Sequence, residues 1–202
     1  MAERSYAIII GAMRSGTTSL YEMLAEHPQI CPCRTKEPHF FCDEQSIPYE
    51  DLWEYDETCH IYSLEASTNY AKYPMIRGVP DRIRAYGLRP KFIYLVRDPI
   101  DRIESQYSFM VNNKGKHVER FSEPRIIACS VYYLQLRQFL QVFSDRDQYL
   151  ILDFESLISE PSTVLTACMT FWASSRWRRF QKEQVIEPRQ ASPMSGSVVL
   201  RG

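Results

Sequence analysis

Residues 6–18 read Tyr6-Ala-Ile-Ile-Ile-Gly-Ala-Met-Arg-Ser-Gly-Thr-Thr18, and this stretch decides the fold. Its first five residues form a continuous apolar run rich in isoleucine, which is typical of a strand buried on both faces of a parallel sheet. Gly11 ends the run, and a helical spacing of apolar residues begins at Thr17 and stops before Pro28. The stretch therefore predicts a buried strand, a tight loop and a helix in immediate succession.

The same pattern recurs along the chain toward the C-terminus. We expect further strands at Gln29–Cys33, Ile61–Leu64, Lys91–Val96 and Tyr149–Leu152, an extended segment at Thr35–Phe41, and helices at Pro80–Tyr86, Pro99–Val111, Pro124–Phe143 and within Glu155–Trp172. Asp98 is a good N-cap for the helix that Pro99 opens. The alternation predicts an α/β fold, a P-loop-like, doubly wound parallel sheet flanked by helices in a single domain. We expect this domain to occupy residues 1–175, and residues 176–202, which are basic and aperiodic, to be poorly ordered or divergent.

Composition excludes several classes of function. The chain has 202 residues and a formal net charge of -1, so it offers no overall attraction to nucleic acid or to an anionic membrane. Its six cysteines follow no CxxC rhythm and its four histidines are scattered, which argues against a metal site and favours a reducing compartment. No apolar run approaches the length of a membrane span, and the first one is too short for a signal peptide. We therefore expect a cytoplasmic protein without a metal, a nucleic-acid partner or a membrane span; its oligomeric state cannot be read from the sequence.

The loop at Gly11–Thr18 has the context that a phosphate-binding loop requires, between a strand and a helix. Free N–H groups at the helix start and the helix dipole favour an oxyanion, and Gly16 permits its close approach. Relative to the G-x-x-x-x-G-K-[ST] pattern of nucleoside triphosphatases, Thr17 replaces the lysine and a cation stands earlier, at Arg14. Such a loop and one cation can hold a phosphosulfate, which carries less charge than a triphosphate. Taken alone, the segment is also consistent with a turn that only caps a helix.

A second candidate anion site follows the second strongly apolar strand of the chain. Arg97 ends that strand, and Ser105 lies eight residues on, in the next helix. Ligands gather at the carboxyl ends of strands in doubly wound sheets, so we expect Arg14 and Arg97 to converge on one crevice. The alternative is an ion pair of Arg97 with Asp98 or Asp101, with Ser105 facing solvent.

Four segments carry a resemblance to a known family. They are Gly11-Ala-Met-Arg-Ser-Gly-Thr-Thr-Ser-Leu20, Lys36-Glu-Pro-His-Phe-Phe41, Glu65-Ala-Ser-Thr-Asn-Tyr70 and Tyr94-Leu-Val-Arg-Asp-Pro-Ile-Asp-Arg102. In this order and spacing they resemble the motifs of sulfotransferases that use 3'-phosphoadenosine 5'-phosphosulfate (PAPS). The likeness is greatest to the bacterial branch related to heparan sulfate sulfotransferases, and it covers about residues 5–172.

The resemblance implies how the sulfuryl donor would be bound. The 5'-phosphosulfate would be held by loop residues Arg14, Ser15, Gly16, Thr17, Thr18 and Ser19. Arg97 and Ser105 would bind the 3'-phosphate, and Tyr132 resembles an aromatic position near the adenine. The family also ends in a Gly/Lys/Arg loop over the 3'-phosphate, for which Arg176–Arg179 and Lys182 are the candidates here.

The resemblance also implies a general base for the acceptor. Glu37 matches the glutamate that removes the proton of the acceptor hydroxyl or amine in the glycosaminoglycan branch. His39 is the reserve candidate, because residues two apart on an extended segment face the same side. Packing against Phe40 and its neighbours is the alternative for His39, and Lys36 is interpreted as a solvated charge.

The reaction so implied is transfer of a sulfuryl group from PAPS, without a metal, to a hydroxyl or amine of a small-molecule or carbohydrate acceptor. Arg14 would stabilise the leaving phosphate of the product 3'-phosphoadenosine 5'-phosphate (PAP). Heparan sulfate relatives carry a lysine where this chain has Ala66, which argues against a glycosaminoglycan acceptor. Two alternatives stay open: an ATP-dependent small-molecule kinase, and a PAP-binding remnant without turnover.

Overall fold

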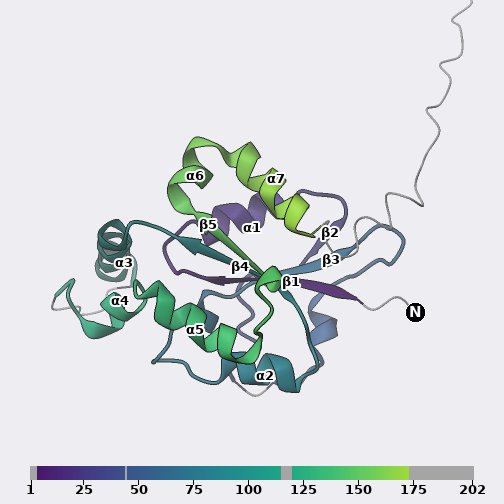
Figure 1. Ribbon diagram of the computed structural model, residues 1–202, viewed down its shortest axis with the longest axis horizontal. Helices are drawn as coiled ribbons and strands as arrows, with labels where there is room; N and C mark the ends of the chain where they lie inside the picture. The colour runs from purple at the N-terminus through teal and green to yellow at the C-terminus, as the bar shows by residue number, and fades with distance from the viewer. Residues whose placement is uncertain (1–3, 44, 115–119, 173–202) are drawn as a thin grey trace, which may run out of the picture.

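The computed structural model describes residues 4–43, 45–114 and 120–172, which contain a five-stranded, fully parallel sheet (Figure 1). In spatial order the strands are β2 (Ile30–Pro32), β3 (Tyr62–Ala66), β1 (Ser5–Gly11), β4 (Lys91–Val96) and β5 (Tyr149–Asp153). The first strand of the chain therefore lies at the centre, paired with β3 and β4. The predicted α/β fold with a P-loop-like parallel sheet is confirmed.

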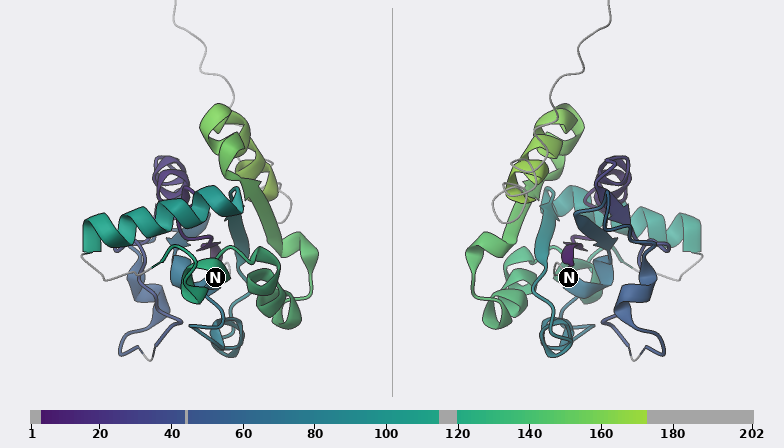
Figure 2. Two further views of the ribbon diagram at one scale, coloured as in Figure 1. Left: turned by 90° about the vertical axis from the view of Figure 1, so that its left-hand side faces the viewer. Right: turned by 90° about the vertical axis from the view of Figure 1, so that its right-hand side faces the viewer.

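Helices cover both faces of the sheet, as a doubly wound fold requires. On one face lie α1 (Thr17–Ala25), α6 (Phe154–Ser159) and α7 (Pro161–Trp172), and on the other lie α2 (Val79–Ala85) and α5 (Tyr132–Val142) (Figure 1). Beside the carboxyl ends of the strands lie α3 (Pro99–Lys114) and α4 (Pro124–Ala128), with α3 crossing that edge of the sheet (Figure 2). The described residues also form the short 3₁₀ helices η1 (Tyr49–Leu52), η2 (Thr68–Ala71) and η3 (Arg146–Gln148).

Burial explains why the central strands are apolar at every position. In β1, Ile8 packs with Phe92 in the core on one face of the sheet. Its neighbour Ile9 packs with Leu20 of α1 in the core on the other face. All four side chains are fully buried. A strand between two helical layers must present apolar side chains to both, so alternation between apolar and polar residues is lost.

The turn from β4 into α3 forms as predicted. Asp98 Oδ1 accepts hydrogen bonds from the backbone N–H groups of Ile100 at 2.8 Å and Asp101 at 3.1 Å. These two bonds satisfy donors that have no partner inside the helix. The Asp98 carboxylate, which could have paired with Arg97, is thus used to cap α3 within a few residues of the strand end.

The single helix predicted over 124–143 is wrong, because the chain breaks at 129–131 into α4 and α5. Two side chains bind carbonyl oxygens at this break. The buried Arg102 donates to the carbonyl oxygen of Ile126 at 2.6 Å, and Gln135 donates to that of Ala128 at 2.8 Å. Carbonyl oxygens at a helix end need such partners. The decisive donor comes from α3, so the local sequence pattern carries no sign of the break.

The remaining predictions concern membrane spans, metal sites and the C-terminal segment. In the part that the structure describes, no helix is long and apolar enough to cross a membrane. Within the same ranges, no group of three or more His, Cys, Asp or Glu side chains is arranged to hold a metal ion. The segment 176–202, with Arg176–Arg179 and Lys182, lies outside the described residues, so its predicted role and the domain boundary stay predictions.

Candidate functional site

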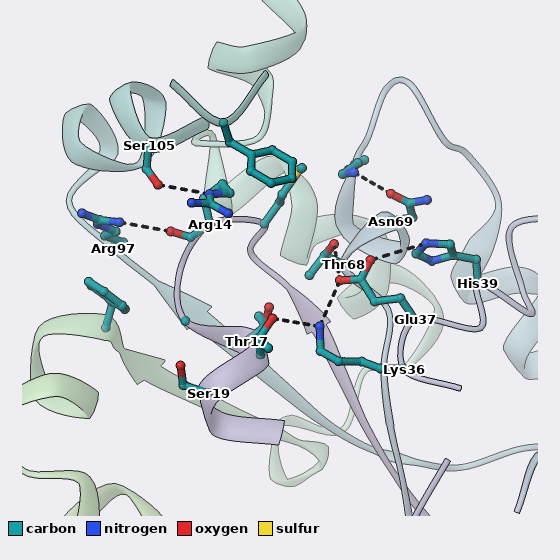
Figure 3. A pocket seen from close by; sticks show the side chains of 16 residues that line it. Arg14, Thr17, Ser19, Lys36, Glu37, His39, Thr68, Asn69, Arg97 and Ser105 are labelled. Carbon is teal, nitrogen blue, oxygen red and sulfur yellow. Dashed lines mark hydrogen bonds and ion pairs between the residues drawn. The ribbon is translucent and has the colours of Figure 1, made fainter. Parts of the chain in front are cut away.

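A cavity of about 610 Å³ lies at the carboxyl ends of β1 and β4, next to α3 (Figure 3). Among the described residues its lining includes four cations, Arg14, Lys36, Lys72 and Arg97, and one carboxylate, that of Glu37. The volume is in the range of small-molecule and cofactor sites. The excess of positive charge favours an anionic ligand.

The loop after β1 places the start of α1 against this cavity. Gly16 has a left-handed conformation, with φ of 82°, and a Cβ atom here would lie 2.8 Å from Cδ2 of Phe154. Only glycine fits without displacing that ring. Gly16, Thr17, Thr18 and Ser19 line the cavity, whereas Ser15 is fully buried and is not among the lining residues. The helix start, with its open N–H groups and dipole, thus faces the space where an anion would sit.

Arg14 and Arg97, which follow β1 and β4, lie on the same cavity. Arg14 Nε donates to Ser105 Oγ at 3.1 Å, and its guanidinium carbon lies 4.6 Å from the ring centroid of Phe109. Arg97 Nη1 donates to the carbonyl oxygen of Arg14 at 3.4 Å, and its guanidinium carbon lies 4.5 Å from the ring centroid of Phe154. We call Arg14, Arg97 and Ser105 the arginine cluster. The aromatic rings restrict both guanidinium groups and hold them at this end of the cavity.

Tyr132 lies behind the arginine cluster. Its hydroxyl donates to the carbonyl oxygen of Arg97 at 2.8 Å and accepts from the Arg97 N–H at 3.4 Å. Burial raises the pKa of Tyr132, so the phenol stays neutral and can both donate and accept. Tyr132 is not among the residues that line the cavity. In this structure it holds the backbone of Arg97, and its predicted contact with adenine stays a prediction.

The segment at 35–41, predicted as extended, is bent instead. Glu37 and His39 both have left-handed backbones, with φ of 58° and 53°. The chain that follows β3 stabilises them: Glu37 N–H donates to the carbonyl oxygen of Ala66 at 2.9 Å, and His39 N–H donates to Ser67 Oγ at 3.1 Å. Left-handed conformations are uncommon for residues other than glycine and need such support. The local sequence pattern, which predicted an extended segment, contains no information about these hydrogen bonds to the chain after β3.

Both side chains of the bent segment nevertheless line the cavity, and we call them the Glu37–His39 pair. His39 Nε2 lies 3.5 Å from Glu37 Oε2, and Thr68 Oγ1 donates to Glu37 Oε1 at 3.1 Å. Burial lowers the pKa of His39, although the negative charge of Glu37 opposes this. A neutral imidazole is therefore favoured near neutral pH. The Glu37 carboxylate therefore faces the cavity beside the imidazole of His39.

A buried carboxyl group lies behind the Glu37–His39 pair. Glu65, at the end of β3, is fully buried and accepts hydrogen bonds from the hydroxyl groups of Ser67, at 2.6 Å, and of Tyr49. Desolvation raises the pKa of Glu65. Ser67 also accepts the backbone N–H of His39, so a chain of hydrogen bonds runs from Glu65 to the wall of the cavity. Buried polar groups need such partners, and together they hold the bent segment in place.

Sequence reasoning missed several cavity residues. Lys36, interpreted as a solvated charge, instead lies in the cavity wall with 29% of its side chain exposed. Its ammonium group donates to Thr18 Oγ1 at 2.8 Å. Lys72 also lines the cavity and donates to Asn69 Oδ1 at 2.5 Å. The position of Lys36 within a recognised motif was the available signal, whereas Lys72 and Phe109 stand outside the quoted motifs.

Comparison with known proteins gives the family. The model of the family described as "Sulfotransferase domain" matches residues 4–198. The chain belongs to the sulfotransferase family. Heparan sulfate glucosamine 3-O-sulfotransferase 5 of Mus musculus is 26% identical over 172 residues, which are 77% of this chain and 49% of the relative. Heparan sulfate glucosamine 3-O-sulfotransferase 3B1 of Homo sapiens is 30% identical over 187 residues, 84% of this chain and 46% of the relative.

Structural comparison agrees with this assignment. A sulfotransferase from Alicyclobacillus acidocaldarius matches with a TM-score of 0.68 and 26% identity, over 85% of this chain and 81% of that chain. The chain spans about half the length of the curated relatives it matches. The predicted resemblance to sulfotransferases is thus confirmed for the family, and the roles of individual residues stay predictions.

Proposed function

We propose that this chain transfers a sulfuryl group from PAPS to a hydroxyl or amine of a small-molecule or carbohydrate acceptor. The observation that carries the proposal is the meeting of the arginine cluster, the start of α1 and Glu37 on one cavity. PAPS carries anionic groups at both its 5' and 3' positions, and an acceptor must lose a proton. The cavity offers cations for the first requirement and a carboxylate for the second.

The donor half of the cavity fits a doubly anionic nucleotide. The helix start around Thr17 would hold the 5'-phosphosulfate through backbone N–H groups. Arg97 and Ser105 would hold the 3'-phosphate, and Arg14 lies between the loop and Ser105, where it can serve either group. PAPS, when bound, supplies the activated S–O bond to its 5'-phosphate. ATP lacks the 3'-phosphate, so the arginine cluster would favour PAPS over ATP.

The acceptor half provides a base. Glu37 would take the proton of the acceptor hydroxyl or amine as the acceptor oxygen or nitrogen bonds to sulfur. The bond between sulfur and the 5'-phosphate oxygen then breaks, and PAP leaves with its electron pair. His39, favoured as a neutral imidazole, would orient the Glu37 carboxylate through its 3.5 Å contact. The cations that line the cavity would stabilise charge on the transferred group and on the leaving phosphate.

The acceptor itself is constrained by the wall near η2. Ala66 is fully buried, and the cation on this side of the cavity is Lys72, which donates to Asn69. The two relatives described above are named for glucosamine units of heparan sulfate. A polar acceptor that can hydrogen bond, whether a carbohydrate or a smaller alcohol or amine, suits this wall.

Calorimetry and a transfer assay test the proposal together. We expect PAP to bind at least about 10-fold more tightly than ATP with Mg²⁺, because only PAP has a 3'-phosphate for the arginine cluster. We also expect labelled PAPS to be cleaved, with transfer to hydroxyl or amine acceptors or slow transfer to water. Tighter binding of ATP with Mg²⁺ would indicate a kinase. Binding of PAP without any cleavage of PAPS would indicate a remnant without turnover.

A further inference from the structure

A fully buried arginine lies behind the loop that would hold the donor. This residue is Arg102, near the start of α3, and its Nη1 atom donates to the carbonyl oxygen of Met13 at 3.4 Å. Met13 lines the cavity and immediately precedes Arg14. Ser105, three residues further along α3, also lines the cavity and accepts from Arg14 (Figure 3). The Arg102 guanidinium therefore lies close to the cavity wall, although Arg102 is not among the lining residues.

The other hydrogen-bond partners of this guanidinium are neutral as well. Its Nη1 donates to Gln106 Oε1 at 2.5 Å, its Nη2 donates to the carbonyl oxygen of Ile126 at 2.6 Å, and its Nε donates to Ser130 Oγ. The described residues contain no ion pair between Arg102 and a carboxylate. A fully buried arginine almost always has such a partner, because an isolated charge is costly to remove from water. The arrangement thus satisfies the N–H groups but leaves the charge without a counter-charge.

The charge stays on Arg102 in spite of its burial. Desolvation lowers the pKa of the guanidinium, and the positive charge of Arg97 adds to this effect. A guanidinium in a protein nevertheless remains protonated. Three positive charges therefore lie at one end of the cavity, those of Arg14 and Arg97 in the wall and that of Arg102 behind it. A buried charge of this kind acts beyond its direct contacts, because little water screens it.

We propose that Arg102 is a further residue of the donor site, and that the anionic groups of the bound nucleotide balance its buried charge. This inference rests on the proposed function. Arg102 is a positioning residue and not a catalytic one, because it holds the Met13 carbonyl and attracts the donor from behind the loop. Gln106 has a part in this arrangement, since a carboxylate in the place of its amide would neutralise Arg102 and weaken the attraction.

Gln106→Glu tests the charge of Arg102 with almost no change of shape. The new carboxylate keeps an acceptor for Arg102 Nη1 and adds a negative charge beside it. We expect PAP affinity, measured by calorimetry, to fall by about 10-fold, because the positive charge that attracts the nucleotide is neutralised. Urea unfolding without ligand should give a stability equal to that of wild type or higher, because the buried arginine gains a charged partner. If Arg102 served the fold alone, PAP affinity would not change.

The matched control is Gln106→Met, which changes the same side chain to one of similar length without adding a charge. We expect its PAP affinity to stay within about 2-fold of wild type, even where its stability falls through the loss of a hydrogen bond. Arg102→Lys is a second, independent test, which applies also if Gln106→Glu does not fold. An ammonium group keeps the charge but cannot reproduce the planar set of donors. We therefore expect lower stability, with PAP affinity within about 3-fold of wild type.

Two results would overturn the inference. Wild-type PAP affinity in folded Gln106→Glu would show that the charge of Arg102 does not reach the nucleotide. A loss of affinity in Arg102→Lys or Gln106→Met as large as that in Gln106→Glu would show that the shape of the network matters and its charge does not. In both cases the proposed function stands, because wild type still binds PAP and cleaves PAPS. A wild-type protein that binds neither PAPS nor PAP would instead refute the proposed function and the inference with it.

Discussion

The arginine cluster and the Glu37–His39 pair line one cavity, yet the chain holds them in place by different means. Arg97 directly follows the end of β4, whereas Arg14 lies in the loop between β1 and α1 and has a left-handed backbone, with φ of 69°. Glu37 and His39 lie on a bent segment between β2 and η1 and depend on hydrogen bonds to the chain after β3. The two arginines thus lie where the chain leaves two central strands, and the pair is held by a local buried network. The two should respond differently to substitution.

Loss of the Glu37 carboxylate should give the largest difference between the acceptor half and the donor half of the cavity, because it affects turnover and not nucleotide affinity. We expect Glu37→Gln to lower kcat by about 10²- to 10⁴-fold, because the acceptor then keeps its proton, while PAP affinity stays at the wild-type value. Single-turnover cleavage of PAPS and calorimetry with PAP measure the two effects. Glu22→Gln, at an exposed position of α1, is the matched control. A joint loss of turnover and PAP affinity would mean that the two halves are not independent.

Removal of a guanidinium group from the arginine cluster should give the opposite result. We expect Arg97→Leu to weaken PAP binding by about 10- to 100-fold, because a charge-assisted contact to the 3'-phosphate is lost. Binding of adenosine 5'-phosphosulfate, which lacks the 3'-phosphate, should change little. Arg89→Leu removes the same charge from an exposed position and should bind PAP as wild type does. If both nucleotides lose affinity equally, Arg97 does not serve the 3'-phosphate.

The same contrast explains what the sequence could predict. Strand, glycine loop and helix start form a local pattern, so the position of Arg14 and Gly16 follows from a dozen consecutive residues. Arg97 follows from a second pattern of the same kind, and parallel strand order brings the two ends together. The fold and the arginine cluster were therefore accessible from the sequence.

The surroundings of Glu37 were not accessible in this way. Glu37 itself was found through the resemblance, but its left-handed backbone is stabilised by Ala66, and that of His39 by Ser67, about 30 positions along the chain. The break between α4 and α5 has the same origin, because Arg102 reaches it from another helix. Long-range contacts of this kind leave no periodic trace in the local sequence.

The buried carboxyl group of Glu65, behind the Glu37–His39 pair, gives the stability of the fold a pH dependence. Because burial raises the pKa of Glu65 above its unfolded value, the folded state binds this proton more tightly than the unfolded state does. The free energy of unfolding should then fall as pH rises above about 4, where the carboxyl group of an unfolded chain ionises. Glu65→Gln cannot ionise and should remove this part of the decline.

Urea unfolding of wild type and Glu65→Gln between about pH 4 and pH 8 measures the difference. We expect the stability of wild type relative to the variant to decrease as pH rises, and turnover of the variant to fall by about 10-fold or less. Glu57→Gln, at an exposed position, is the control and should follow wild type. If the stability of wild type relative to the variant instead increased with pH, the pKa of Glu65 would be lowered by folding. Glu65 would then not support the fold in its protonated form.

The smallest expected effect tests the backbone support of the arginine cluster. Tyr132→Phe removes the hydroxyl that donates to the carbonyl oxygen of Arg97 at 2.8 Å and leaves the ring in place. A neutral hydrogen bond contributes about 1 kcal/mol, so we expect PAP affinity to fall by about 5-fold, with kcat nearly unchanged. Tyr133→Phe is the control, because the neighbouring ring is 70% exposed. A much larger loss of affinity, confined to ligands that contain adenine, would instead support a contact between Tyr132 and the base. A loss of affinity that pyrophosphate shares would show that the Tyr132 hydroxyl acts by holding the backbone of Arg97.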